Sequence, residues 1–201
     1  ADLVTDRATL IGAANTLIFR KDGKIHADNT DGYGFLENLK SGAPNWNPSA
    51  GPATVLGAGG AARAVISSLL DSGVPEILLT NRTKIRAESL AENFGNRVKV
   101  IDWVQAGNIL EGSALVVNTT ALGMVGKKEM RIPLDGLSIN TIVTDLVYTP
   151  LETDLLTTAR QIGCVTIDGL GMLLHQAVPG FERWFGLRPT VDNDTRAIAL
   201  Q

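Results

Sequence analysis

The sequence predicts an α/β protein with a doubly wound parallel sheet, accompanied by remnants of a second α/β domain. First, six short apolar runs occur between residues 53 and 167, continuous rather than alternating, as in strands covered on both faces. Second, helical patterns separate several of these runs, which is typical of right-handed βαβ units. Third, both ends of the chain break this alternation, which indicates that they belong to another unit.

The predicted strands of the parallel sheet are short segments rich in apolar residues. They are ATVL (53–56), EILLT (76–80), VKVI (98–101), ALVVN (114–118), TIVTDL (141–146) and CVTI (164–167). Helical patterns, in which apolar side chains recur on one face, cover 60–72, 84–94 and 152–162. Six strands match the number in the doubly wound dinucleotide-binding fold.

The two ends of the chain carry a different pattern. Residues 16–32 are typical of two strands around a tight turn. Residues 170–201 indicate a helix, a proline-marked loop and a short last helix. Neither piece could bury its apolar face alone. We therefore expect a dinucleotide-binding domain at 32–169, flanked by segments 1–31 and 170–201 that pack together as part of a second domain.

Composition excludes several classes of function. The chain has 201 residues, a net charge of −3 and a pI near 5.4, which gives no general attraction to nucleic acid or anionic membranes. No apolar run is long enough to span a bilayer. No metal site is expected, because His26 and His175 lack Cys or carboxylate partners at ligand spacing. The single Cys164 excludes an internal disulfide and suits a reducing cytoplasm.

A glycine-rich turn follows the first strand of the predicted sheet and opens a helix. In TVLGAGGAARAV, Gly57, Gly59 and Ala62 form a Gly-x-Gly-x-x-Ala pattern. The first glycine permits a tight turn, the second lets the backbone approach a pyrophosphate, and the alanine allows close packing of helix on strand. Amides at the helix start then face the anion. The expected dinucleotide contacts of this Rossmann turn are Gly57, Ala58, Gly59, Gly60 and Ala61.

A cluster of donors and positive charge follows the second strand, which in this fold ends beside the adenosine ribose. A carboxylate there would repel a 2′-phosphate, whereas Arg82 offers a planar fork of donors that matches it. Asn81, Thr83 and Arg86 can add hydrogen bonds. The alternative is a solvated basic helix start, but basic residues in a first helical turn oppose the helix dipole. The sequence therefore predicts NADP rather than NAD as the cofactor.

Seven short motifs occur in a specific order along the chain. They are GAANT (12–16), NTDG (29–32), GAGGAARA (57–64), NRT (81–83), NTTALGM (118–124), DLVYTPLETDLL (145–156) and DGLGMLLHQA (168–177). Together they closely resemble the shikimate dehydrogenase family, which includes shikimate/quinate dehydrogenases. The resemblance covers nearly the whole chain. It implies reduction of 3-dehydroshikimate to shikimate with NADPH, a step of aromatic amino acid biosynthesis, in a cleft between a substrate domain and the nucleotide domain.

The resemblance also implies roles for individual residues. Asp31 corresponds to the catalytic Asp of the family's Lys–Asp pair and also contacts substrate. The other residues at substrate-contacting positions are Asn15, Tyr148 and Gln176. The further residues at cofactor-lining positions are Thr119, Gly169 and Met172. Without the resemblance, Asp31 would be read as a plain helix cap, because it precedes the helical stretch YGFLENL.

One part of the family's pattern is missing. The catalytic Lys of the family lies upstream of GAANT, and none of Lys21, Lys24 or Lys40 stands in the matching motif. The chain also lacks an initial Met and a signal peptide. We therefore expect a truncated chain that lacks most of the substrate domain and turns over poorly alone.

Alternatives to this function stay open at this point. One is a quinate/shikimate relative with broader substrate or NAD use, and the other is a non-catalytic NADP-binding module. The partner expected in either enzymatic reading is a small molecule, and a homodimer is left open.

Overall fold

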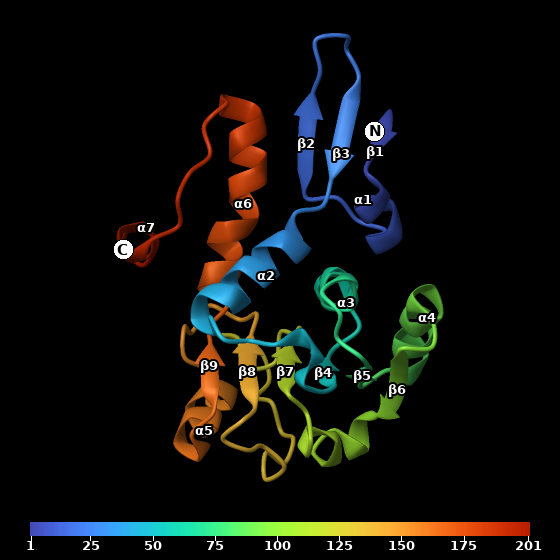
Figure 1. The fold of residues 1–201 in the computed structure, drawn as a ribbon, viewed down its shortest axis with the longest axis vertical. Helices are drawn as coiled ribbons and strands as arrows, with labels where there is room; N and C mark the ends of the chain where they lie inside the picture. The colour runs from blue at the N-terminus through green and yellow to red at the C-terminus, as the bar shows by residue number, and fades with distance from the viewer.

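The computed structural model describes residues 1–201 and contains two β-sheets (Figure 1). The larger sheet has six parallel strands in the order β6-β5-β4-β7-β8-β9. The strands are β4 (Ala53–Leu56), β5 (Ile77–Asn81), β6 (Val98–Asp102), β7 (Leu115–Asn118), β8 (Ile142–Asp145) and β9 (Val165–Ile167). The strand order reverses direction at β4, so the doubly wound parallel sheet is confirmed.

Both faces of this sheet are covered, which explains the continuous apolar runs. All four residues of β4 and all four of β7 are buried. Val55 belongs to a core with α3 (Gly60–Asp71), whereas its neighbour Leu56 belongs to a second core with α5 (Asp154–Ile162). Adjacent side chains of a strand point to opposite faces, so a central strand is buried at every position and is mostly apolar.

The connections of the larger sheet are less regular than strict strand–helix alternation. Helix α3 follows β4, helix α4 (Lys84–Phe94) follows β5, and helix α5 follows β8. Only two 3₁₀ turns, Trp103–Gln105 and Asn108–Leu110, lie between β6 and β7. Residues 119–141, between β7 and β8, contain no helix. This connection leaves the sheet at its carboxyl edge and runs as an irregular loop (Figure 1).

The smaller sheet, of three strands in the order β1-β3-β2, lies at the N-terminal end. The predicted hairpin is confirmed, since β2 (Thr16–Phe19) pairs antiparallel with β3 (Ile25–Asp28). Strand β1 (Leu3–Val4) and helix α1 (Asp6–Ile11) were not predicted from the sequence. They have two and six residues, too few to show a periodic pattern.

Helix α2 (Asp31–Gly42) connects the two sheets and crosses α6 (Leu170–Phe185) at very short distance (Figure 1). A Cβ on Gly34 would lie 2.7 Å from the Cβ of Gln176, so only glycine allows this approach. Helix α2 also packs on α3, where a Cβ on Gly32 would lie 3.2 Å from the Ala64 carbonyl oxygen. Helix α2 therefore packs against both α3 and α6, and strand β2 of the N-terminal hairpin contacts α6.

The C-terminal segment follows the predicted order of helix, loop and short helix. Helix α6 continues through Pro179, and the loop that follows it carries Pro189 before α7 (Asn193–Ala199). Arg196 of α7 donates to Asp168 Oδ2 at 2.8 Å, which ties the last helix to the end of β9. None of the helices has the length and apolarity that crossing a lipid bilayer requires.

Candidate dinucleotide and substrate site

The carboxyl ends of the central strands bring the candidate residues of the larger sheet to one edge. Leu56 of β4 is in register with Thr80 of β5 and with Asn118 of β7. Asn118 in turn is in register with Asp145 of β8. Because the strands are parallel, the segments that follow them emerge side by side, which is where open α/β sheets bind ligands.

The turn after β4 has the geometry of an anion site. Gly57 adopts φ 110°, and a Cβ there would lie 2.7 Å from Thr119 Oγ1, so only glycine fits. Helix α3 then begins without any side chain capping its first amides. A Cβ on Gly59 or Gly60 would meet nothing within 4 Å, so the space above these amides is open. An open helix start with uncapped amides fits the pyrophosphate of a dinucleotide.

The cluster after β5 leaves two guanidinium groups free. Arg82 and Arg86 form no ion pair within residues 1–201. Lys84 differs, because its ammonium lies 2.7 Å from Asp102 Oδ1, and the hydrogen bond to Asp102 raises the pKa of Lys84. Thr83 is the N-cap of α4, but its hydroxyl makes no capping bond.

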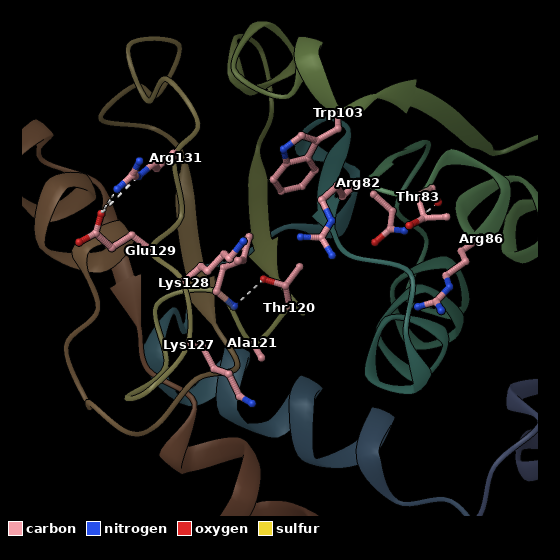
Figure 2. Close-up of a pocket in the computed structure, with 12 residues that line it drawn as sticks. Arg82, Thr83, Arg86, Trp103, Thr120, Ala121, Lys127, Lys128, Glu129 and Arg131 are labelled. Carbon is pink, nitrogen blue, oxygen red and sulfur yellow. Dashed lines mark hydrogen bonds and ion pairs between the residues drawn. The ribbon is translucent and has the colours of Figure 1, made fainter.

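A cavity of about 810 Å³ lies beside this cluster (Figure 2). The predicted residues Asn81, Arg82, Thr83 and Arg86 form one wall. The other walls come from the turn after β6 and from the β7–β8 connection, and their residues were not among the predicted site residues. Those residues are Trp103, Thr120, Ala121, Leu122, Lys127, Lys128, Glu129 and Arg131. The irregular connection has no periodicity, and only its run of basic residues could have drawn attention to it.

Thr119 and Asn118 hold the start of that connection. Thr119 uses both its amide and its hydroxyl on the Leu56 carbonyl oxygen, each at 2.8 Å. Asn118 accepts from the Thr120 amide at 2.9 Å and donates to Asp145 Oδ1 at 2.8 Å. Asp145 is fully buried, and burial raises its pKa despite hydrogen bonds from Val147, Thr153 and Asn118. The predicted Thr119 therefore lies directly against the glycine-rich turn.

Three of the four predicted substrate residues come together at the start of α2. The side-chain amide of Asn15 donates to Asp31 Oδ1 at 2.8 Å and reaches Gln176 Oε1 at 3.5 Å. Asn15 immediately precedes β2 and Asp31 begins α2, whereas Gln176 lies on α6, far along the chain. The Asp31 carboxylate accepts from Asn15 and Asn29 and from no backbone amide of α2. The alternative that Asp31 is a plain helix cap is therefore not supported.

Asn29, which the sequence analysis did not single out, orders this cluster. It is 2% exposed, its Oδ1 accepts from the Asp31 amide at 3.0 Å, and its side-chain amide donates to the Ala13 carbonyl oxygen at 3.3 Å. The Thr30 hydroxyl donates to Asn15 Oδ1 at 3.0 Å. The NTDG motif thus supplies both a carboxylate and the side chains that hold it.

A buried carboxylate, Asp28, anchors the same strand. Arg7 Nε donates to Asp28 Oδ1 at 2.7 Å, and Arg183 of α6 lies 2.9 Å from Asp28 Oδ2. Burial alone would raise the pKa of Asp28, but hydrogen bonds from Arg7 and Thr5 hold that pKa well below its usual range. The group ties α1, β3 and α6 into one unit.

The remaining predicted residues lie around the end of β8. Tyr148 is 43% exposed on the β8–α5 loop, before a cis Thr149–Pro150 bond, and no hydrogen bond joins it to Asp31. The Gly169 amide donates to the Val147 carbonyl oxygen at 3.3 Å, so the start of α6 adjoins the Tyr148 loop. Met172 is packed in the main core and is 8% exposed. No group of three His, Cys, Asp or Glu side chains is placed to hold a metal ion.

Two features define a dinucleotide-binding protein of the doubly wound class. One is the open, amide-lined turn after the first strand of the parallel sheet, and the other is the pair of free arginines after the second strand. Residues 45–135 match the family described as shikimate / quinate 5-dehydrogenase, and residues 169–198 match the shikimate 5′-dehydrogenase C-terminal domain. The chain belongs to the shikimate dehydrogenase family, as the motif resemblance predicted.

Curated relatives extend over the entire chain. An NADP(+) shikimate dehydrogenase of Cereibacter sphaeroides is 68% identical over 200 residues, which are 100% of this chain and 72% of that relative. One of Roseobacter denitrificans is 69% identical with the same coverage. The chain therefore spans less than three quarters of the length of these relatives.

Solved structures agree with the fold. Quinate dehydrogenase from Corynebacterium glutamicum, solved with NAD, superposes with a TM-score of 0.91 at 32% identity, over 100% of this chain and 72% of that one. Shikimate 5-dehydrogenase from Thermus thermophilus, solved with NADP(H) and shikimate, gives 0.81 at 39% identity, over 94% and 68%.

Proposed function

We propose that these residues are the cofactor-binding part, and one wall of the substrate site, of an NADP-dependent shikimate dehydrogenase that reduces 3-dehydroshikimate to shikimate. The observation that carries this proposal is the free Arg82 in a cavity next to an open phosphate turn. A carboxylate at that place would bind a ribose hydroxyl, whereas a guanidinium fits a 2′-phosphate. The curated relatives named above are NADP(+) enzymes, which supports the same choice.

We assign different parts of the cofactor to the different groups of residues at this edge of the sheet. Gly57 to Ala61 and Thr119 would hold the pyrophosphate side of the cofactor, and Asn81, Arg82, Thr83 and Arg86 the adenosine phosphate. Gly169 and Met172 would support the nicotinamide side at the start of α6. We further propose the boundaries expected from the sequence: a nucleotide domain at 32–169, with 1–31 and 170–201 on the substrate side.

Bound NADPH supplies the hydride to the substrate ketone. The chain's own residues orient the substrate and manage its charge. Asn15 and Gln176 offer amide groups to substrate hydroxyls, and a buried hydroxyl without a partner would be costly. Asp31, held by Asn15 and Asn29, would orient a proton donor beside the oxygen on which negative charge develops. Tyr148 would contact the substrate from the β8–α5 loop.

Asp31 has no cationic partner within residues 1–201. Because reduction of a ketone needs a proton donor for the developing oxyanion, we expect residues 1–201 alone to bind NADP but to reduce 3-dehydroshikimate very slowly. Localisation in the cytoplasm and assembly as a homodimer remain predictions that rest on the sequence alone.

Calorimetric titration with NADP and NAD tests the proposal. We expect the chain to bind NADP more tightly than NAD, and Arg82→Asp to reverse this order, because a carboxylate repels the 2′-phosphate and accepts from a ribose hydroxyl. The loss of NADP affinity should be on the order of a hundredfold, which corresponds to about 3 kcal/mol. Glu92→Gln on the exposed side of α4 is the control. An unchanged order in Arg82→Asp would remove the basis of the NADP assignment.

A second candidate is a quinate/shikimate relative that uses NAD. The superposition on the NAD-bound quinate dehydrogenase favours it, and the free arginines oppose it. The same titration decides between them. A third candidate, a non-catalytic NADP-binding module, would give the ordered Asn15–Asp31–Gln176 cluster no function. If the chain binds shikimate and Asp31→Asn abolishes that binding, the non-catalytic module is excluded.

A further inference from the structure

The cavity beside Arg82 has a second cationic wall on the β7–β8 connection. Lys127, Lys128 and Arg131 line it from that connection, whereas Arg82 and Arg86 line it from the end of β5 and the start of α4. Figure 2 shows Arg82 and Lys128 entering the same space from opposite sides. Cationic groups that converge on one cavity from two elements are arranged for an anionic ligand group.

The cations of the second wall differ in how free they are. Arg131 lies 3.2 Å from Glu129 Oε2, and in Figure 2 both side chains turn away from Arg82. Lys127 and Lys128 both lack an ion-pair partner within residues 1–201, but in Figure 2 the Lys127 side chain extends away from Arg82, whereas that of Lys128 extends toward it. The ammonium of Lys128 is therefore available to a ligand, whereas the guanidinium of Arg131 is already occupied.

The backbone fixes the position of Lys128 although the connection has no helix. The Gly123 amide donates to the Lys128 carbonyl oxygen at 2.8 Å, which closes the turn 123–128 at its base. The Val125 amide at the tip donates to the Thr149 carbonyl oxygen at 2.9 Å, so the turn is also held from the β8–α5 loop. Asn118 donates to the Leu122 carbonyl oxygen at 3.3 Å and ties the start of the connection to the sheet. These hydrogen bonds fix the backbone of Lys128 at the wall of the cavity.

The charge of a 2′-phosphate needs more than Arg82. A phosphomonoester carries about −1.5 to −2 at pH 7, and Arg82 supplies one positive charge. Arg86 lines the same cavity, but in Figure 2 its guanidinium extends toward α3, away from Arg82. Lys128 is the free cation that faces Arg82 across the cavity. A lysine acts on phosphate as a point charge and does not require the planar alignment of an arginine.

We propose that Lys128 determines cofactor specificity together with Arg82, binding the nucleotide's 2′-phosphate from the opposite wall of the cavity. This inference rests on the proposed function, because it assigns Lys128 to the phosphate that distinguishes NADP from NAD. It makes recognition of the 2′-phosphate a property of two separate segments, the β5–α4 turn and the β7–β8 connection.

Calorimetric titration of the full 201-residue chain with NADP, NAD and adenosine 2′-monophosphate tests the inference. We expect Lys128→Gln to weaken binding of NADP and of adenosine 2′-monophosphate by about five- to tenfold, and to change NAD binding by less than about twofold. Lys128→Arg should restore most of the NADP affinity. Lys99→Gln on β6, an exposed lysine outside the cavity, is the charge-matched control and should leave all three affinities unchanged.

Each outcome separates the inference from the function on which it rests. If Lys128→Gln changes NADP affinity by less than about twofold while Arg82→Gln lowers it strongly, Lys128 is not a phosphate ligand and only the inference fails. Equal losses for NADP and NAD would also overturn the inference, because Lys128 would then act on a part that both cofactors share. If the unsubstituted chain shows no preference for NADP, the proposed function fails, and the inference with it.

Discussion

Asp28 of the smaller sheet and Asp145 of the larger sheet are both 0% exposed at the end of a strand, but their surroundings differ. Two guanidinium groups, from Arg7 and Arg183, bind Asp28, and its pKa is lowered. Asp145 has only neutral donors, and its pKa is raised. The first carboxylate joins segments that are remote in the chain, and the second joins loops of a sheet that is already packed.

This difference shows how the two halves of the site are held. The larger sheet orders its loops through strand register and a dry core, so neutral hydrogen bonds suffice. The smaller sheet is more exposed, with both residues of β1 at the surface. The charged hydrogen bonds of Asp28 then hold α1, β3 and α6 together. Such bonds are individually strong, but removing one partner leaves a buried charge unpaired.

The largest expected effect is on the smaller sheet. Asp28→Asn should lower the free energy of unfolding at pH 7 by about 3 kcal/mol, because it removes the charge that two guanidinium groups share. Urea denaturation measures this loss. Asp22→Asn, in the exposed hairpin turn, is the matched control and should change stability by less than about 0.5 kcal/mol. Equal stability of the two variants would contradict the role given to Asp28.

The glycine-rich turn of the larger sheet allows a test with two identical substitutions of opposite sign. Gly57→Ala should cost about 2 kcal/mol, since φ is 110° there and the added Cβ would lie 2.7 Å from Thr119 Oγ1. Gly60→Ala, in the first turn of α3 with open space around it, should stabilise by about 0.5 kcal/mol. Thermal unfolding of both variants without ligand gives the comparison, and a loss in both would disprove the packing argument.

The pH dependence of stability should have opposite signs for the two carboxylates. The pKa of Asp28 is lowered on folding, so its stabilisation is present above about pH 4 and is lost as the pH falls toward its folded pKa. The pKa of Asp145 is raised, so its contribution is present below about pH 4 and is lost as the pH rises through its folded pKa.

Urea unfolding between about pH 3 and 7 checks both signs. Asp28→Asn should flatten the acid limb of the profile relative to the unsubstituted chain. Asp145→Asn should remove the loss of stability that accompanies ionisation of Asp145. It should lower the free energy of unfolding at pH 7 by about 1 kcal/mol or less. Parallel profiles for the two variants would show that their surroundings do not differ as described.

The smallest expected effect concerns Lys84, which adjoins the phosphate cluster but is paired with Asp102. Lys84→Gln should change NADP affinity by less than about twofold, because its ammonium is already engaged on the β6 side. Calorimetric titration of Lys84→Gln and Arg82→Gln with NADP compares the two variants, and Arg82→Gln should bind NADP much more weakly. A comparable loss in both variants would place Lys84 in the phosphate site.

Much of the nucleotide side could be predicted from sequence. Its strands are buried on both faces, so they appear as continuous apolar runs, and its glycine-rich turn and Arg82 stand at strand ends. The β7–β8 connection could not be predicted in this way, because Lys128 stands in no periodic pattern. Strand β1 and helix α1 are too short to produce one. Asp28 was missed because its partners, Arg7 and Arg183, lie far from it in the chain.

The sequence by itself determined the class of fold, the phosphate turn and the cationic residues after the second strand, since each depends on residues within a few positions of one another. The tertiary structure alone decided which charges stay free. Lys84 pairs with Asp102 beside the cavity and Arg131 pairs with Glu129 in its wall, whereas the lining residues Arg82, Arg86, Lys127 and Lys128 stay unpaired. The tertiary structure also assembled Asn15, Asp31 and Gln176, which are brought together only when α2 crosses α6 at Gly34. Ion pairing and helix crossing depend on distances between remote segments, and those distances exist only in the folded chain.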